Sequence, residues 1–183
     1  MSIRPQDVVA VLAIETGAWE KGWTFPELAQ ASGLSLSEAH AAVKRAAKAR
    51  LLIAAIGSKG FVVARENLLE FLVHGVKYAF PAERGRVTRG VPTAHSAPVL
   101  AEHIVVSDDD VLVWPHATGG SRGEAMAPLY KTVPDIALQN AKLYDALALV
   151  DAIRAGRARE RKLAAELLEA RIISDLSDEP LMK

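Results

Sequence analysis

Residues 33–64 read GLSLSEAHAAVKRAAKARLL and then IAAIGSKGFVVA, and this stretch decides the fold class. Ser35 and Glu38 have the spacing of a capping box, which predicts a helix that begins beside them. The helix continues to about residue 51, with apolar residues every three or four positions on its inner face. The two apolar runs that follow, 53–56 and 61–64, flank four residues with glycine at both ends. That arrangement predicts a two-stranded hairpin.

Helices are also expected on both sides of this stretch. The first covers residues 5–16, which have proline at the start and apolar residues at helical spacing. Thr24 and Glu27 form a second capping-box pattern, so a short helix precedes the turn at Gly33. After the hairpin, residues 65–80 have the pattern of another amphipathic helix.

The composition indicates a helical protein without cysteine chemistry. The chain has 183 residues, half of them hydrophobic and none of them cysteine, which excludes disulfides, thiolate-bound zinc and a catalytic thiol. Abundant Ala and Leu favour helix, so the expected fold class is mainly α. Asp7 and Glu15 interrupt the apolar residues near the N-terminus, which therefore predict neither a membrane span nor a signal peptide. We expect a cytoplasmic protein.

The net charge is zero, but its distribution along the chain is uneven. Residues 39–89 hold ten Lys and Arg against three acids, whereas residues 101–183 hold ten against fourteen. A local excess of positive charge indicates an anionic partner. The excess falls on the segment that contains the expected helix and hairpin, which favours a nucleic acid as that partner.

The order helix, helix, glycine turn, helix, hairpin resembles that of bacterial winged-helix transcriptional regulators, broadly the MarR-like group. Their second helix carries Glu-Leu-Ala and their third opens on Gly-Leu-Ser-x-Ser, and this chain has these residues at 27–29 and 33–37. The resemblance covers about residues 5–80, less than half of the chain, and the domain it implies is residues 1–80. It implies a winged helix-turn-helix DNA-binding domain with a short two-stranded wing.

The third helix of such proteins enters the major groove of double-stranded DNA. The resemblance therefore implies sequence-specific DNA binding by a dimeric transcriptional regulator, in particular a repressor. It places on the DNA side Ser35, Leu36, Ser37, His40, Ala41, Lys44 and Arg45, with Lys48 beside the backbone and Lys59 at the tip of the wing. Serine hydroxyls at a helix N-terminus suit phosphate contacts, and long cationic side chains reach phosphates or guanine edges. The same fold also serves in protein interactions, so an antitoxin or adaptor subunit is the alternative.

Residues 81–134 contain six of the nine prolines and several glycines, which predicts a loop-rich, irregular segment with one short strand at 111–114. Arg84, Arg86 and Arg89 alternate there with small residues, and an extended arm of this kind could follow a phosphate backbone. Alternatively, these arginines pair with carboxylates of the acidic second half, such as Asp108–Asp110. A surface for a protein partner is a third use.

Residues 135–183 return to helical spacing, with helices expected at 135–155 and about 158–173. The first is apolar on more than one face, so it is either central in the fold or covered by another subunit. Dimerisation through this helical region is the favoured use, and burial within the monomer is the alternative. Any protein partner is expected to bind within residues 81–173.

No pattern in the chain predicts an enzyme. Residues 119–123 match Gly-x-Ser-x-Gly, but a nucleophile elbow needs a strand, a strained turn and a helix within a large sheet. Four of the five histidines lie between residues 74 and 116 without a metal-ligand spacing such as His-Glu-x-x-His. Phosphate-binding and dinucleotide-binding glycine motifs are also missing from the sequence. We therefore expect no catalytic residue, no metal and no cofactor.

Overall fold

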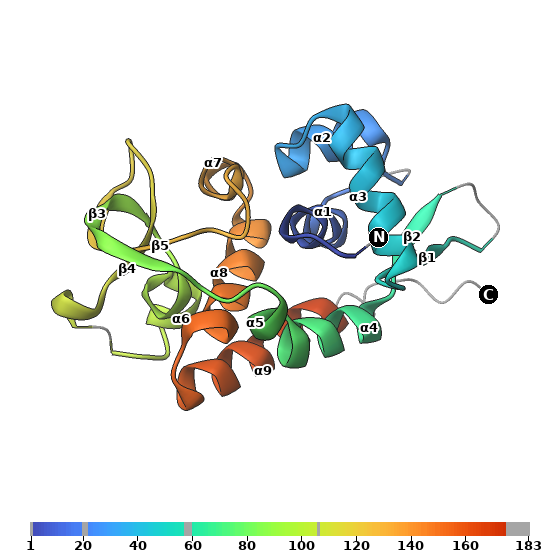
Figure 1. Ribbon diagram of the computed structural model, residues 1–183. Helices are drawn as coiled ribbons and strands as arrows, with labels where there is room; N and C mark the ends of the chain where they lie inside the picture. Colours follow the sequence, from blue (N-terminus) through green and yellow to red (C-terminus); the bar gives the residue numbers. More distant parts are fainter. Residues whose placement is uncertain (1, 20–21, 57–59, 106, 175–183) are drawn as a thin grey trace.

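The computed structural model describes residues 2–19, 22–56, 60–105 and 107–174, and it is mainly helical with two small groups of strands (Figure 1). Three helices and an antiparallel hairpin come first, as the sequence predicts. They are α1 (Pro5–Thr16), α2 (Phe25–Ser32), α3 (Leu36–Lys48), β1 (Leu52–Ala54) and β2 (Phe61–Val63).

The short connection between α2 and α3 depends on its glycine. Gly33 has a φ of 65°, in the left-handed region that glycine enters without a Cβ penalty, and its N–H donates to the carbonyls of Ala29 and Gln30. At the start of α2, the Thr24 and Glu27 capping box has both of its hydrogen bonds. The caps and the turn expected from the sequence are therefore confirmed.

One longer helical segment follows the hairpin, where the sequence predicts a helix over 65–80. It consists of α4 (Arg65–Glu70), a π-helical turn (Phe71–Gly75) and α5 (Val76–Ala79). Leu68, Leu72 and Val76 are fully buried at intervals of four residues. A π-helical turn adds one residue to the turn, and such turns are frequent at functional positions.

The middle of the chain contains regular strands, and the expectation of an irregular segment over 81–134 is wrong. Its elements are β3 (Arg84–Pro92), a 3-10 turn (Ala94–Ser96), α6 (Pro98–Ala101), a second 3-10 turn (Asp108–Asp110), β4 (Leu112–Pro115) and β5 (Ser121–Met126). β3 runs antiparallel to both β4 and β5, and β4 and β5 are parallel, so the three strands close on one another. The short strand expected at 111–114 is confirmed by β4.

Glycines in this segment allow the strands to close, and a proline lies where it does not interrupt them. A Cβ on Gly90 would lie 2.0 Å from the Trp114 carbonyl oxygen, and one on Gly123 would lie 2.3 Å from that of Val111. Such close backbone approaches need glycine. Pro92 is the last residue of its strand, at the end of the ladder, where proline is tolerated.

The helix expected over 135–155 is broken into α7 (Val133–Gln139) and α8 (Ala141–Ala155). Asn140 causes the break, because its extended backbone ends α7 and its side chain accepts a hydrogen bond from the Leu143 N–H (3.1 Å) to start α8. The last described helix is α9 (Ala158–Ser174). No helix within the described ranges is both long and apolar enough to cross a membrane.

Helix α8 lies at the centre of the molecule, between the first helices and the closed strands (Figure 1). Every residue from Ala146 to Ile153 is buried. Its buried Asp151 accepts hydrogen bonds from the Thr93 hydroxyl (2.9 Å), the Trp114 indole (2.5 Å) and the Arg154 guanidinium (2.5 Å). The chain itself therefore covers α8, and this helix leaves no apolar face for a second subunit.

Candidate nucleic-acid interface

Helix α3 begins at a complete capping box. The Glu38 backbone N–H donates to the Ser35 hydroxyl (3.2 Å), and the Ser35 N–H donates to the Glu38 carboxylate (3.0 Å). The Ser35 hydroxyl donates to the same carboxylate (2.8 Å). These bonds satisfy amides that have no partner inside the helix. The polar groups of Ser35 are thus engaged in starting the helix, and a carboxylate already lies at its N-terminus.

One stripe of α3 is open to solvent. One side of the helix carries Ser37, Ala41, Lys44 and Lys48 at intervals of four, three and four residues, with His40 beside Ala41 and four residues before Lys44. Ser37, His40, Lys44 and Lys48 are exposed, and Ala41 is partly accessible. Within the part of the chain that the structure describes, neither lysine has an ion-pair partner. The stripe therefore carries two cations and no carboxylate.

Two more side chains border the start of this stripe. The His40 ring stacks on the Phe25 ring, with centroids 3.6 Å apart and an angle of 20° between the planes. This contact orients the imidazole at the edge of the stripe. Leu36 is 49% exposed in the first turn, where an apolar side chain can contact a thymine methyl group.

Arg45 does not belong to the exposed surface, and its assignment to the DNA side is wrong. It is 7% exposed and forms a bidentate pair with Asp7 of α1, with Nε–Oδ2 at 2.8 Å and Nη2–Oδ1 at 2.5 Å. The hydrogen bonds that Arg45 donates to Asp7 raise the pKa of Arg45. Asp7 also accepts from the Arg4 N–H (2.8 Å) at the start of α1. Arg45 directly follows Lys44, and at this position the surface of α3 faces α1. The Arg45 guanidinium therefore holds α1 and α3 together.

The second half of the chain contacts the α2–α3 turn, which the sequence did not reveal. The Tyr130 hydroxyl donates to the Glu38 carboxylate (2.9 Å), and the Thr132 hydroxyl donates to the Ser32 carbonyl (3.1 Å). Bonds from Ser35 and then from Tyr130 hold the pKa of Glu38 below its ordinary value. Lys131 lies exposed between these two contacts and also lowers that pKa through its charge. A cation from the second half therefore stands beside the N-terminal end of α3.

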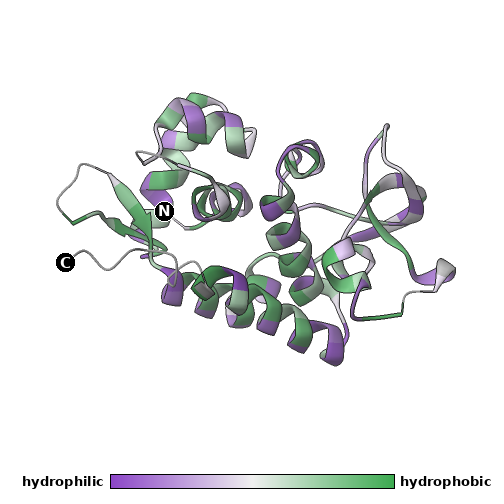
Figure 2. Ribbon diagram, turned by 180° about the vertical axis from the view of Figure 1, so that it is seen from behind, coloured by the Kyte–Doolittle hydropathy of each residue, from purple (hydrophilic) through white to green (hydrophobic). Residues whose placement is uncertain are grey.

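The hairpin carries apolar side chains outward. Ile53 and Val62 are directly opposite on its two strands and are 49% and 46% exposed, and Ile56 is fully exposed. Figure 2 shows the hydrophobic colour along both strands. Lys59, the cation expected at the tip, lies outside the described residues. The Trp23 indole donates to the Phe61 carbonyl (3.1 Å) and so fastens the hairpin to the segment before α2.

The three arginines of the expected arm lie on strand β3 and have different surroundings. Arg84 pairs with Glu124 of β5 (2.9 Å), an acid of the second half, although not with residues 108–110. Arg86 and Arg89 are exposed, and neither has an acidic partner among the described residues. Arg89 stands directly opposite the exposed Arg122 of β5, which the sequence reading missed. Like charges in this register repel each other, so this face of the strands would favour an anion.

The residues considered for catalysis or metal binding do not form a site of either kind among the described residues. Ser121 is the first residue of β5, so the Gly-x-Ser-x-Gly string is not a strand–turn–helix elbow. His95 is buried, with Nε2 2.6 Å from the Asp110 carbonyl oxygen and Nδ1 3.8 Å from the Glu160 carboxylate. The described side chains include no group of three His, Asp or Glu placed to hold a metal ion.

No protein-family model, curated protein or solved structure matches this chain. The case for its function therefore depends on the exposed stripe of α3 and on the contacts that hold α3 in position.

Proposed function

We propose that residues 1–80 form a winged helix-turn-helix domain that binds double-stranded DNA sequence-specifically and that the chain acts as a transcriptional regulator, in particular a repressor. The order of α1, α2, the Gly33 turn, α3 and the hairpin supports this proposal. The bond from Trp23 to Phe61 supports it further, because it joins the segment before α2 to the hairpin. In such a domain α3 enters the major groove.

The observation that carries the proposal is the carboxylate-free stripe of α3. Ser37 and His40, in its first half, supply hydrogen-bonding groups for base edges. Lys44 and Lys48 supply cations for phosphates, and neither is tied up in an ion pair among the described residues. The buried Arg45 has no part in this surface, since its guanidinium is bound to α1.

Lys131 extends the stripe at the opposite end from Lys48. Helix α3 has 13 residues and is therefore about 20 Å long, which exceeds the major-groove width of about 12 Å. Cations at both ends of the helix suit the phosphates on the two sides of the groove. Arg86, Arg89 and Arg122 provide a further surface for a phosphate backbone.

Fluorescence anisotropy with promoter-derived and random duplexes at several salt concentrations tests the proposal. The double variant Lys44→Ala/Lys48→Ala should weaken binding and reduce the slope of log K against log salt by about 1.8, because each phosphate that a lysine neutralises contributes about 0.9. The control Lys142→Ala/Arg159→Ala removes two exposed charges from α8 and α9 and should leave the slope unchanged. An equal effect of both variants, or no binding by the wild type at low salt, refutes the proposal.

The apolar hairpin favours a second candidate function, that of a protein-interaction module such as an antitoxin or adaptor subunit. Ile53, Ile56 and Val62 form an exposed apolar group, and such groups mark protein contacts. Association through this group would change little with salt, because apolar burial is not screened. Partner binding that is insensitive to salt and is abolished by Ile53→Ser/Val62→Ser would favour this function over DNA binding.

A further inference from the structure

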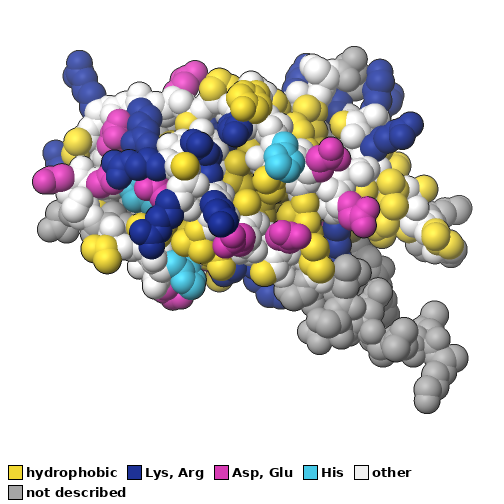
Figure 3. Space-filling model, turned by 90° about the horizontal axis from the view of Figure 1, so that it is seen from below, with side chains coloured by type: hydrophobic (Ala, Val, Ile, Leu, Met, Phe, Trp, Pro, Cys, Tyr) yellow, Lys and Arg dark blue, Asp and Glu magenta, His cyan; other side chains and the backbone are white. Residues whose placement is uncertain are grey.

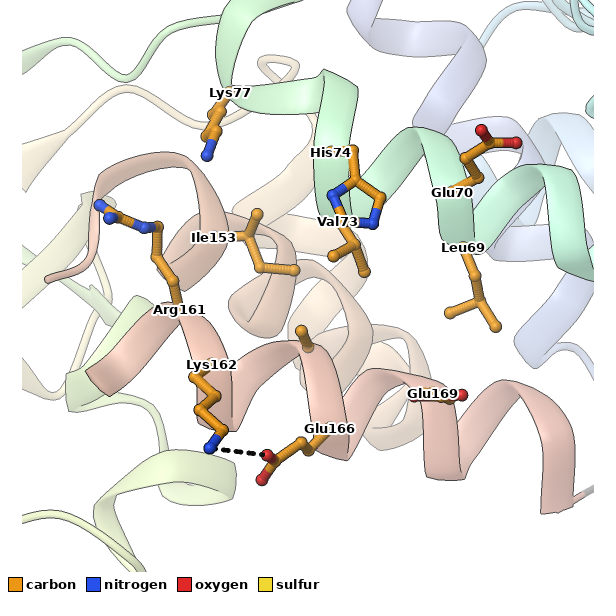
Figure 4. A pocket seen from close by; sticks show the side chains of 11 residues that line it. Leu69, Glu70, Val73, His74, Lys77, Ile153, Arg161, Lys162, Glu166 and Glu169 are labelled. Carbon is orange, nitrogen blue, oxygen red and sulfur yellow. Dashed lines mark ion pairs between the residues drawn. The ribbon is translucent and has the colours of Figure 1, made fainter. Parts of the chain in front are cut away.

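A groove runs between the helical segment α4–α5 and helix α9, on the lower side of the molecule in Figure 1. Its volume is about 450 Å³. The two walls are antiparallel, and Ile153 of α8 lies between them at the bottom (Figure 4). Leu69 and Val73 on one wall and Ala165 on the other complete an apolar floor. The fold thus leaves an apolar surface recessed between two helices.

Both walls line the groove over about two helical turns. On α4–α5 the lining positions run from 69 to 77, and on α9 they run from 161 to 169. At about 1.5 Å per residue each wall is therefore about 12 Å long. The π-helical turn forms the middle of its wall, where Val73 and His74 both line the groove.

Charges of one sign gather at each end of the groove, and they come from both walls. Lys77 and Arg161 lie at one end, and Glu70 and Glu169 lie toward the other (Figure 4). None of these four side chains has an ion-pair partner in the described part of the chain. Like charges on facing walls repel each other. A partner of opposite charge at each end would relieve this repulsion.

One ion pair joins the two groups of charges within α9. It lies between Lys162 and Glu166 at 3.9 Å, and the side chains are 80% and 60% exposed. An exposed pair contributes little energy, and lysine before glutamate is the weaker order along a helix. Figure 3 looks onto this face, where Lys and Arg side chains crowd the left of a hydrophobic strip and acidic side chains lie along its right part. Both groups of charges remain available to a partner.

We propose that this groove binds one amphipathic helix of a partner protein, which carries acids at one end, bases at the other and an apolar stripe between them. The anchors of a helix in a groove recur at positions i, i+3, i+4 and i+7. They span about 10.5 Å along the helix axis, which fits walls of about 12 Å. The acidic end of the partner helix lies over the cations of the groove, and its basic end lies over the glutamates.

The backbone chemistry of the walls favours a helix over an extended peptide. Helical walls bond their N–H and C=O groups internally, so the groove offers no sheet edge to which an extended segment could pair. Such a segment would lay unpaired polar groups on the apolar floor, which is costly. A helix satisfies its own backbone and presents only side chains to the floor.

The separated charges disfavour occupants of uniform charge. A nucleic acid or an anionic membrane would be repelled by the glutamates, and a polycation would be repelled by the basic residues. A helix with acids near its N-terminus and bases near its C-terminus matches both ends and also suits its own macrodipole. In that order the partner helix runs parallel to α9. The groove shares no residue with the exposed stripe of α3, so the inference stands whether or not the chain binds DNA.

Fluorescence anisotropy with three helical peptides tests the groove. The peptides have about 16 residues and leucines at i, i+3, i+4 and i+7, and a covalent staple keeps them helical. The mixed peptide has glutamates in its N-terminal half and lysines in its C-terminal half. The other two carry only glutamates or only lysines at the same positions. The wild type should bind the mixed peptide about tenfold more tightly than either of the others, because a uniform peptide is repelled at one end.

Charge reversal at one end of the groove should change which peptide is preferred. Arg161→Glu/Lys162→Glu makes the groove mostly acidic and should prefer the lysine peptide. Glu166→Lys/Glu169→Lys makes it mostly basic and should prefer the glutamate peptide. All four side chains are exposed on α9, so circular dichroism should show both variants folded.

A further pair of variants locates the bound peptide. Ala165→Arg places a long side chain at the centre of the groove and should abolish binding of the mixed peptide. The matched control Ala117→Arg adds the same charge at an exposed position between β4 and β5 and should bind like the wild type. Equal binding by the two variants would show that the peptide lies elsewhere.

Three other results overturn the proposal. The first is a wild type that does not bind the mixed peptide, or reversal variants that keep the wild-type preference. The second is displacement of the mixed peptide by a DNA duplex, because the occupant would then be a nucleic acid. The third is a wild type that is dimeric by light scattering and binds none of the peptides, because a second copy would then cover the groove.

Discussion

Substitution of Arg45 by methionine tests whether this residue holds helices together or contacts DNA. The change keeps an apolar stem and leaves the Asp7 carboxylate buried without its cation. Breaking a buried ion pair by removing one partner costs about 3–5 kcal/mol of unfolding free energy. For a chain of this size each kcal/mol corresponds to about 2–4 °C, so the melting temperature should fall by roughly 6–20 °C.

The decisive comparison adds Asp7→Asn to Arg45→Met and follows thermal unfolding by circular dichroism. Asparagine has no charge, and its amide oxygen can still accept the hydrogen bond from the Arg4 N–H. The double variant should therefore recover part of the melting temperature that Arg45→Met loses. Lys44→Ala is the matched control, because an exposed side chain without an ion pair should change stability by less than about 0.5 kcal/mol.

The opposite pattern would refute this reasoning about Arg45. If Arg45→Met kept the wild-type melting temperature and abolished DNA binding, the guanidinium would face DNA and not α1. If Asp7→Asn made the Arg45 variant less stable still, an unpaired buried carboxylate would not be the cause of the instability.

Three further changes test the contacts around the α2–α3 turn. Tyr130→Phe should cost at most about 1 kcal/mol, because it removes a partly solvated hydrogen bond to Glu38. Because the pKa of Glu38 is lowered in the folded protein, its carboxylate stabilises the fold above the ordinary pKa of this group, and that stabilisation is lost as the pH falls. Urea titrations should therefore show a smaller difference between Tyr130→Phe and the wild type in acid. Lys131→Ala should reduce the salt slope of DNA binding by about 0.9, and an unchanged slope would exclude a phosphate contact there. Gly33→Ala should lower the melting temperature measurably, since the left-handed backbone costs about 1 kcal/mol or more and the new Cβ would lie 2.7 Å from Cβ of Thr132.

Local signals predicted the first third of the chain because they determine its structure there. The capping boxes and the glycine between α2 and α3 act over three or four residues, so they are visible in the sequence. The middle segment was mispredicted because glycine is compatible with two kinds of structure. Glycine favours loops in general, yet Gly90 and Gly123 permit close approach of strands that are distant in sequence.

The sequence of α3 alone could not predict that the Arg45 side chain points inward. Lys44 and Arg45 are neighbours, and only the position of α1 decides which of them is buried. Asp7, one of two acids in the mostly apolar helix α1, was the signal in the sequence, since a buried carboxylate needs a partner. Pairing the two residues requires the crossing of α1 and α3, which no local pattern contains.

The contacts of Tyr130 and Thr132 imply that the second half of the chain sets the orientation of α3. Both side chains are bound close to the glycine turn, one to the first turn of α3 and the other to the last residue of α2. Two turns further along the same side of α3, the Arg45–Asp7 pair fixes it to α1, which itself packs against the central α8. Helix α3 is therefore held near both of its ends by groups that do not face the exposed stripe. A change in α7 or α8 would reach the stripe through these bonds without altering any residue on it.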